Sequence, residues 1–452
     1  MQNQVYPTIP PAPKKPLPKI LIYLAIGLVV VLLIFFLIKL FSSGKGKVSN
    51  EIVWWGLWED ASIVNPIIAE YQQKNPKVKI KYVEQSKEDY RERLTNALAK
   101  GTGPDIFRFH NSWVPMFKNQ LDMLPAEVMS ASEYAKTFFP SAARDLSNGA
   151  SLVGIPLEYD ALTLYINEEI FSKEGKTPPS TWDDLRATAV SLTHKDEKGQ
   201  ILQSGVALGR TENVDHWQEI LALMMLQNGA DLANPKGKLA ENALRFFTVF
   251  STTDGVWDVT LPSSTAAFAG GKLAMYFAPS WRALEIRQNN PSLNFKTVPL
   301  PQLPKATPSE KGVSYASYWA EGVWNKSKNK KAAWDFLKFL SSKETLEKLY
   351  QNASKIRNFG EPYPRVDMLQ LLADHPILGS VVTSSADSQS WYLQSRTFDG
   401  PTGINSLVSK YFEDAVNAVA LGKEADKALE TASQGVQQIL AQYGLTSTQS
   451  SY

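Results

Sequence analysis

The sequence contains no cysteine. This absence excludes disulfide bonds, zinc sites with thiolate ligands, cysteine nucleophiles and a lipid attached to an N-terminal cysteine. A chain without cysteine is compatible with a reducing or an oxidising compartment, so this absence alone does not locate the protein.

Neither sign of charge dominates the sequence. The 47 Lys and Arg residues and 45 Asp and Glu residues leave a net charge of +2. With no global positive field, binding to nucleic acid would need a local basic patch. The short lysine cluster at 326–331 is more typical of the solvated start of a helix. We therefore expect no nucleic-acid partner.

The motifs of several enzyme classes are also missing. The sequence has no His-Glu-x-x-His, no Gly-x-Ser-x-Gly, no EF-hand loop and no dinucleotide fingerprint. Gly270-Gly271-Lys272-Leu273 lacks the spacing and the hydroxyl residue of a P-loop, so ATP hydrolysis through that motif is excluded. We expect no cofactor and no metal site. The four histidines occur singly, as surface or capping residues would: His110, His194, His216 and His375.

Two acidic pairs keep a catalytic alternative open. Glu59-Asp60 and Glu158 with Asp160 could act on a glycosidic bond if their carboxyl groups flanked it at about 5–5.5 or 6.5–9.5 Å. Adjacent acids are more often caps or surface charges. We therefore expect a protein that is not an enzyme, and a surface-anchored glycoside hydrolase remains an alternative.

The N-terminal segment predicts a membrane anchor. Ile20 to Ile38 is an uncharged run of 19 residues, about 28 Å long as a helix, which is close to the roughly 30 Å of a bilayer core. No Ala-x-Ala cleavage site follows it, which favours an uncleaved transmembrane helix over 20–41. Equal numbers of lysines flank the two sides, so charge does not decide the orientation. Residues 1–19 are Pro-rich and expected to be disordered, and 42–50 form a flexible linker.

The remaining pattern alternates strands and helices. At 452 residues the chain exceeds what one hydrophobic core usually serves, so two lobes are expected. Strand, helix, strand, helix and strand follow from Glu51, which indicates a mostly parallel α/β sheet. The C-terminal third is mainly helical. The strands are expected at 51–55, 78–82, 105–109 and 161–166, and the helices at 63–71, 90–98, 217–226, 242–250, 332–340, 344–350, 406–421 and 424–441.

Aromatic residues are abundant, with 12 Trp and 17 Tyr. A flat indole ring can pack against the C–H face of a sugar while nearby polar side chains bind its hydroxyls. Core packing is the other use of tryptophan. We expect it for Trp54, Trp182, Trp257 and Trp334.

A series of short motifs in a fixed order resembles the family 1 extracellular solute-binding proteins of ABC importers, the group that includes the maltose-binding protein. The resemblance runs from Glu51 to Gly444. Each motif is weak alone, and their order makes the match specific. The motifs are Trp55-Gly56, Glu70 to Pro76, Gly101-Thr102-Gly103-Pro104-Asp105-Ile106, Gly154-Ile155-Pro156-Leu157, Leu164-Tyr165-Ile166-Asn167, Pro178 to Trp182, Phe268 to Met275 and Lys328 to Leu337.

This resemblance implies a two-lobed, periplasmic-binding-protein-like (type II) α/β fold with hinge crossovers, preceded by one transmembrane helix. Lobe 1 would comprise 51–156 and 320–345, and lobe 2 would comprise 157–319 and 346–444, with a disordered tail at 445–452. The crossovers would lie near 155–160, 313–319 and 341–348. Ligand would be trapped in the cleft as the lobes close.

The resemblance also implies the ligand-binding residues. Asp160 matches a carboxylate that meets sugar hydroxyls, and Trp281 resembles a stacking tryptophan. Asn111 and Ser112 replace charged side chains of the maltose-binding protein, which leaves the particular sugar open. The complete predicted set is Trp55, Trp58, Glu59, His110, Asn111, Trp113, Tyr159, Asp160, Arg210, Trp281 and Arg396.

Taken together, these features predict a monomeric, membrane-anchored extracellular protein that binds a mono- or oligosaccharide and delivers it to an ABC permease. The anchor helix would replace the missing lipidated cysteine and would leave the binding domain outside the cell. A polyamine, peptide, phosphoester or metal chelate in the same fold remains an alternative ligand. A sensor that presents its closed form to a receptor remains an alternative role.

Overall fold

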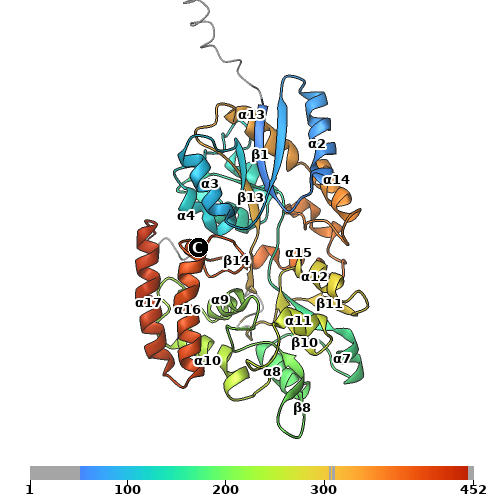
Figure 1. Ribbon diagram of the computed structural model, residues 1–452, viewed down its shortest axis with the longest axis vertical. Helices are drawn as coiled ribbons and strands as arrows, with labels where there is room; N and C mark the ends of the chain where they lie inside the picture. Colours follow the sequence, from blue (N-terminus) through green and yellow to red (C-terminus); the bar gives the residue numbers. More distant parts are fainter. Residues whose placement is uncertain (1–50, 305–306, 308–310, 446–452) are drawn as a thin grey trace, which may run out of the picture. The chain divides into compact units, whose positions relative to one another are not determined.

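The computed structural model describes residues 51–304, 307 and 311–445 (Figure 1). The predicted N-terminal tail, transmembrane anchor and linker at 1–50 lie outside the described residues, as does the C-terminal tail beyond Leu445. Within the described part of the chain, no helix combines the length and apolar character needed to cross a bilayer.

The first sheet has five strands in the order β2-β1-β3-β13-β6. β1 is parallel to β2 and β3, whereas β13 is antiparallel to β3 and β6. The predicted parallel strand–helix–strand unit therefore forms most of this sheet, and a strand from much later in the chain completes it. The strands are β1 (Glu51–Leu57), β2 (Lys79–Gln85), β3 (Ile106–His110), β6 (Ile155–Pro156) and β13 (Trp319–Val323).

Helices from both halves of the chain cover this sheet. α2 and α14 lie side by side (Figure 1), and the Asn352 side chain donates a hydrogen bond to the carbonyl of Ile63. α13 packs against both α2 and β13. The helices and short strands of this part are α2 (Ala61–Lys74), α3 (Tyr90–Ala99), η1 (Asn111–Trp113), α4 (Val114–Phe117), α5 (Ala131–Thr137), α6 (Pro140–Asp145), β4 (Ser147–Asn148), β5 (Ser151–Leu152), α13 (Lys330–Leu340) and α14 (Lys343–Ser354).

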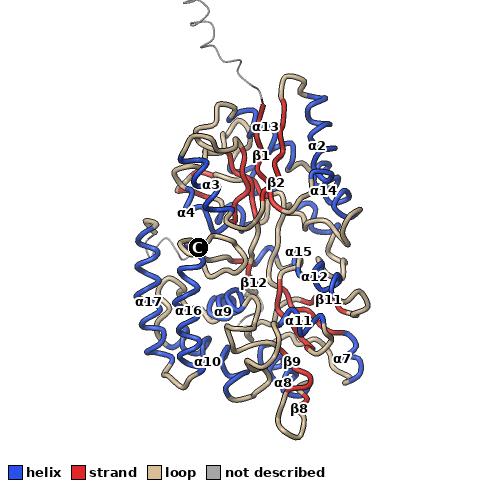
Figure 2. Tube along the Cα trace, viewed as in Figure 1, coloured by secondary structure: helices blue, strands red, loops and turns tan. Residues whose placement is uncertain are grey.

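The second sheet has the order β11-β7-β10-β9-β8. β10 is parallel to β9 and antiparallel to β7. Figure 2 shows the two groups of strands with β12 between them. This part contains β7 (Thr163–Asn167), α7 (Glu168–Lys173), α8 (Trp182–Ser191), β8 (His194–Lys195), β9 (Ile201–Val206), α9 (Trp217–Gln227), α10 (Lys238–Thr252), α11 (Ser264–Ala269), β10 (Leu273–Ala278), α12 (Arg282–Asn289) and β11 (Phe295–Val298).

The C-terminal third is helical, as predicted. The two longest helices in this region, α16 and α17, pack against each other and against α10. Short elements connect them to the rest of the fold. The short elements are β12 (Ser314–Tyr315), η2 (Val366–Leu371), α15 (Gly379–Thr383), η3 (Ser385–Asp387) and β14 (Ser388–Gln389), and the two long helices are α16 (Ile404–Ala420) and α17 (Ala425–Gln442).

The chain passes between the two sheets three times. It crosses between β6 and β7, between β11 and β13, and again after α14. The two-lobed α/β fold is therefore confirmed. The third crossing was wrongly expected at 341–348, because Ser342 caps α14 there by accepting a hydrogen bond from the backbone of Thr345. The predicted lobe boundary between 345 and 346 also falls inside α14.

The predicted core tryptophans are buried. Trp54, Trp182, Trp257 and Trp334 are at most 4% exposed. α8 begins directly after Thr181, whose hydroxyl accepts a hydrogen bond from the backbone of Asp184.

Candidate functional site

Strained backbone marks one region of the structure. Among the described residues, five non-glycine residues have positive φ, and four of them are Trp58 (62°), His216 (63°), Arg396 (56°) and Phe398 (53°). A bulky side chain in the left-handed region costs free energy and persists where the surroundings enforce it, commonly at functional sites. Trp58 and Phe398 contact each other through their rings, and the ring of His216 contacts the predicted site residue Trp281.

An aromatic cluster surrounds Trp319. The ring of Trp58 lies edge-on to Trp319 at 5.3 Å between centroids, and Trp113 and His110 contact Trp319 at 5.2 and 5.1 Å. Trp58 is 36% exposed, whereas Trp113 is fully buried. The structure thus brings three predicted residues together around a fourth that the sequence did not single out.

Trp58 also connects the first sheet with the C-terminal third of the chain. Its ring centroid lies 5.9 Å from that of Phe398, which precedes α16. A second connection runs from Ser112, whose hydroxyl donates to the Asn405 side chain at 2.9 Å. The residues that follow β1 and β3 therefore touch the segment that follows β14.

His110 is buried and neutral. Its Nδ1 lies 2.8 Å from Ser112 Oγ and its Nε2 lies 3.2 Å from Ser317 Oγ. Burial lowers the pKa of His110 to about 3, although the charge of Glu219 acts in the opposite direction. At neutral pH this imidazole is therefore a hydrogen-bonding group and not a charge.

Asp160 connects the first crossing to the second sheet. Its carboxylate accepts hydrogen bonds from the backbone and hydroxyl of Ser280 at 3.0 and 2.9 Å and from the backbone of Ala161 at 2.8 Å. Burial nevertheless raises the pKa of Asp160 to about 7, against these hydrogen bonds. Because Ser280 precedes Trp281, this contact brings two predicted residues close in space.

Trp281 is half-buried and adjoins a polar cluster. Arg282 Cζ lies 4.4 Å from the centre of the indole ring, and the ring of His216 meets it edge-on at 5.7 Å. Arg282 Nε donates to His216 Nε2 at 2.9 Å, which leaves the proton of neutral His216 on Nδ1, 3.0 Å from Ser395 Oγ. The cluster is thus a continuous hydrogen-bonded chain.

Asp215 brings Arg396 into this cluster. Arg396 donates to Asp215 Oδ1 at 3.0 Å, and Arg282 Nη2 lies 3.6 Å from the same oxygen. Burial acts to raise the pKa of Asp215, but a hydrogen bond from Thr265 and the charge of Arg282 lower it to about 2. Arg396 is half exposed, so its guanidinium is accessible while its carboxylate partner stays ionised.

Glu59 points into a buried ion network that the sequence did not predict. Arg108 donates to Glu59 Oε2 at 2.5 Å and to Glu321 Oε1 at 2.8 Å, and all three side chains are at most 10% exposed. Burial raises the pKa of Glu59, and Arg108 opposes this rise. The sequence feature that could have indicated this network is the charge of Arg108 within the otherwise largely apolar strand Ile106–His110.

The other predicted residues lie outside this arrangement. Trp55 is partly buried against the core, and Tyr159 packs between Phe139 and Tyr318. Asn111 donates to Asp145 at 3.0 Å. Arg210 pairs with Glu212, with Nε 3.6 Å from the carboxylate.

A separate cavity of about 670 Å³ shares only Asn111 with the predicted set. Its polar side chains are largely paired within the protein. For example, Lys118 donates to the carbonyl of Tyr443, and Arg144 donates to Asp145 and to the carbonyl of Ser388.

Comparison with known proteins gives a consistent picture. The family of bacterial extracellular solute-binding proteins matches residues 55–347. A protein of Brucella abortus described only as a binding protein is 23% identical over 293 residues, covering 62% of this chain and 69% of that protein. The maltotriose-binding protein of Pyrococcus abyssi is 22% identical over 320 residues, covering 68% of this chain and 65% of that protein.

Solved structures share the fold at low sequence identity. A cyclo/maltodextrin-binding protein in complex with maltotetraose superposes with a TM-score of 0.70 at 16% identity, covering 88% of this chain and 98% of the other. The sugar-binding protein MalE from Xanthomonas citri also gives 0.70, at 18% identity, covering 87% and 98%.

Proposed function

This chain belongs to the family of bacterial extracellular solute-binding proteins, and we propose that it captures a mono- or oligosaccharide between its two lobes and releases it, chemically unaltered, to an ABC permease. Relatives and structural neighbours whose names specify a ligand include binders of maltotriose, diacetylchitobiose and maltodextrin. The ligand of this chain would belong to the same chemical class.

The observation that carries the proposal is the position of Trp58. A large indole is left 36% exposed on a strained backbone, beside Trp319 and Phe398. Burying such a side chain in the core would lower the free energy of folding more than leaving it exposed. Exposed aromatic rings beside hydrogen-bonding groups are what a sugar requires, since its C–H faces pack on rings and its hydroxyls need donors and acceptors.

Polar groups for the hydroxyls lie in the neighbouring clusters. Arg396 is exposed. Ser317 lies beside His110 and Ser395 lies beside His216, and both serines are partly exposed. Neutral imidazoles and hydroxyls can donate and accept without a net charge, which suits an uncharged ligand. A polyamine or a phosphoester would need an excess of one charge, whereas Arg396 is already paired with Asp215.

Lobe closure is the proposed mechanism. The Trp58–Phe398 and Ser112–Asn405 contacts join residues that follow strands of the first sheet to residues beside α16. A ligand bound beside these contacts would touch both sides only while the two segments meet. Binding would therefore shift the population toward the closed form.

The membrane anchor is part of the same proposal. A helix at 20–41 would hold a monomeric binding domain outside the cell, tethered by 42–50, where captured ligand can reach a permease in the same membrane. The length and apolar character of this segment support the assignment. Alkaline carbonate extraction of cell membranes tests it: the full-length chain should stay in the membrane pellet, and its release would exclude a spanning anchor.

A fluorescence screen tests ligand capture. The full-length chain is titrated with mono-, di- and oligosaccharides while intrinsic tryptophan emission is followed, because Trp58 and Trp281 would lose solvent contact on binding. We expect a saturable change with at least one saccharide. If no saccharide gives a response and a polyamine, peptide or phosphoester binds saturably, the proposed ligand would be that compound and not a sugar. Release of reducing sugar would instead favour the glycoside hydrolase.

A further inference from the structure

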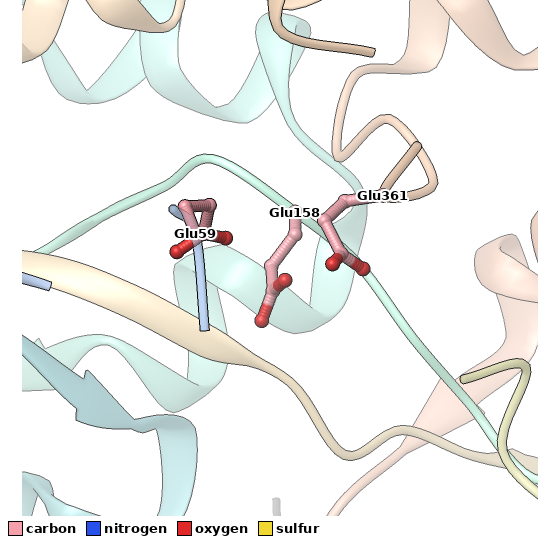
Figure 3. A group of neighbouring side chains, drawn as sticks. All are labelled: Glu59, Glu158 and Glu361. Carbon is pink, nitrogen blue, oxygen red and sulfur yellow. The ribbon is translucent and has the colours of Figure 1, made fainter. Parts of the chain in front are cut away.

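Three carboxylates from separate segments converge at the junction of the lobes. Glu59 follows β1, Glu158 lies on the first crossing and Glu361 follows α14. One carboxylate oxygen from each lies within 4.8 Å of one from each of the other two. Figure 3 shows the three side chains gathered in this way.

Each of these carboxylates has one oxygen engaged and one free. Glu59 Oε2 accepts from Arg108, Glu158 Oε1 accepts from the backbone of Trp319 at 3.2 Å, and Glu361 Oε1 accepts from Arg357 at 2.6 Å. The second oxygen of each has no hydrogen-bond partner within the described part of the chain.

Glu158 is the least compensated of the three. The residue is only 8% exposed, and its one hydrogen-bond partner among the described residues is the uncharged backbone N–H of Trp319. Burying a carboxylate with so little compensation is costly, so such a group normally gains a cation or a proton. Glu158 is more than nine-tenths buried, and its Oε2 has no hydrogen-bond partner among the described residues. This unpaired oxygen is a second sign that a ligand is bound here.

The cluster borders a small cavity. A cavity of about 40 Å³ is lined by Glu59, Glu158, Glu361, Arg108 and Arg357, together with apolar and aromatic side chains. One water needs about 10–15 Å³ of such volume, so this cavity can hold an ion with one or two waters.

The charges of the cluster do not balance. Glu321 adds a fourth carboxylate, while Arg108 and Arg357 are the guanidiniums facing the cluster. Arg108 is shared by Glu59 and Glu321, and Arg357 pairs with Glu361, so two negative charges remain uncompensated.

We propose that Glu59, Glu158 and Glu361 bind a divalent cation of the size of Ca²⁺. Carboxylate oxygens are its preferred ligands. Oxygens placed about 2.4 Å from one ion are at most about 4.8 Å apart, and the three oxygens of this cluster lie within that limit. One divalent ion neutralises the two uncompensated charges. It joins the end of β1, the first crossing and the segment after α14, and so fixes the base of the hinge.

Thermal unfolding of the full-length chain tests the proposal. The protein is stripped with EDTA, dialysed and melted in CaCl₂, in MgCl₂ and in NaCl of matched ionic strength. We expect CaCl₂ to raise Tm by a few degrees at saturation. MgCl₂ should raise Tm less because Mg²⁺ demands tighter octahedral geometry, and NaCl should not reproduce the shift.

Two matched variants separate ion binding from a structural role. Glu158→Gln keeps the shape of the side chain and removes its charge, so its Tm without Ca²⁺ should equal or exceed that of the wild type while the Ca²⁺ shift is lost. Glu169→Gln, at an exposed position on α7, makes the same change of charge and should keep the full shift. Equal Ca²⁺ shifts in Glu158→Gln and the wild type would overturn the assignment.

Terbium luminescence provides a readout that does not need a variant. Tb³⁺ replaces Ca²⁺ at oxygen sites, and Trp54, Tyr350 and Tyr363 line the cavity closely enough to sensitise it. We expect emission that CaCl₂ abolishes by competition. A wild-type Tm that Ca²⁺ does not change, with no sensitised emission, would show that protons neutralise the cluster and would contradict the proposal. Neither result decides whether the chain binds a saccharide, so the proposed function is tested separately.

Discussion

Trp58 and Phe398 meet across the junction of the lobes with their ring centroids 5.9 Å apart, and both adopt the left-handed backbone conformation. Strain on both sides of a single contact indicates that the surrounding structure holds each ring in place. The contact is therefore the natural place to test whether the two sides act together on a ligand.

We expect Trp58→Ala to weaken saccharide binding by about 1 kcal/mol or more, which is fivefold or more in Kd, because an aromatic stacking surface is lost. Phe398→Ala should have a smaller effect in the same direction. Calorimetric titration of both single variants and the double variant measures their coupling. Leu421→Ala, at a residue 88% exposed beyond α16, is the control and should leave Kd unchanged.

Trp281→Ala is expected to weaken binding by at least about 1 kcal/mol, because its indole would stack on the ligand. Arg282 lies over the same ring, so Trp281→Phe should retain part of the affinity by keeping an aromatic surface beside the guanidinium. The affinities are compared by the same titration. Wild-type affinity in Trp281→Ala would remove this residue from the ligand site.

Arg108→Met is expected to destabilise the fold by about 3–5 kcal/mol, because Glu59 and Glu321 would be left buried without their partner. Urea unfolding measures the change. Arg186→Met is the matched control: Arg186 also makes a two-pronged contact, with Asp254, but its side chain is 40% exposed. Loss of this pair, whose arginine is open to solvent, should cost about 1 kcal/mol or less. Equal losses in both variants would contradict the burial argument.

His110 predicts a pH dependence of stability with a defined sign. Its pKa falls from 6.5 to about 3 on folding, so between these values the unfolded chain binds more protons than the folded one. Stability from this group is complete above pH 6.5 and is lost as the pH falls. At pH 5 the loss relative to pH 7.5 is about 2 kcal/mol.

Urea unfolding of the wild type and His110→Gln at pH 7.5 and pH 5 isolates this contribution. The wild type should lose about 2 kcal/mol more than the variant between the two pH values. His194→Gln, on the short strand β8, should retain the wild-type dependence. If His110→Gln and the wild type lose the same free energy, His110 is not held neutral.

Most of the fold could be predicted because it depends on local patterns. Apolar residues at helical spacing placed α9, α10, α13, α16 and α17 within a few residues of their observed bounds. The resemblance placed the third crossing at 341–348, whereas the helical spacing of apolar residues placed a helix at 344–350. Only the packing of α14 against α2 decides between them.

The site was harder to predict because its contacts join distant parts of the chain. Trp319 faces His110 through the register of β13 on β3, which no local pattern specifies. Arg108 pairs with Glu321 on β13 and with Glu59, which follows β1. Tyr159 and Asn111 have polar groups that suit a ligand, but the structure buries them at no more than 2% exposure.

The most direct test of the account is calorimetric titration of the full-length wild-type chain with the saccharide that responds in the fluorescence screen, followed by mass analysis of the sugar recovered from the complex. If the chain captures a saccharide and releases it chemically unaltered, we expect saturable binding with one sugar per chain and recovery of that sugar with its mass unchanged. Absence of a binding isotherm, or recovery of a hydrolysed sugar, would contradict it.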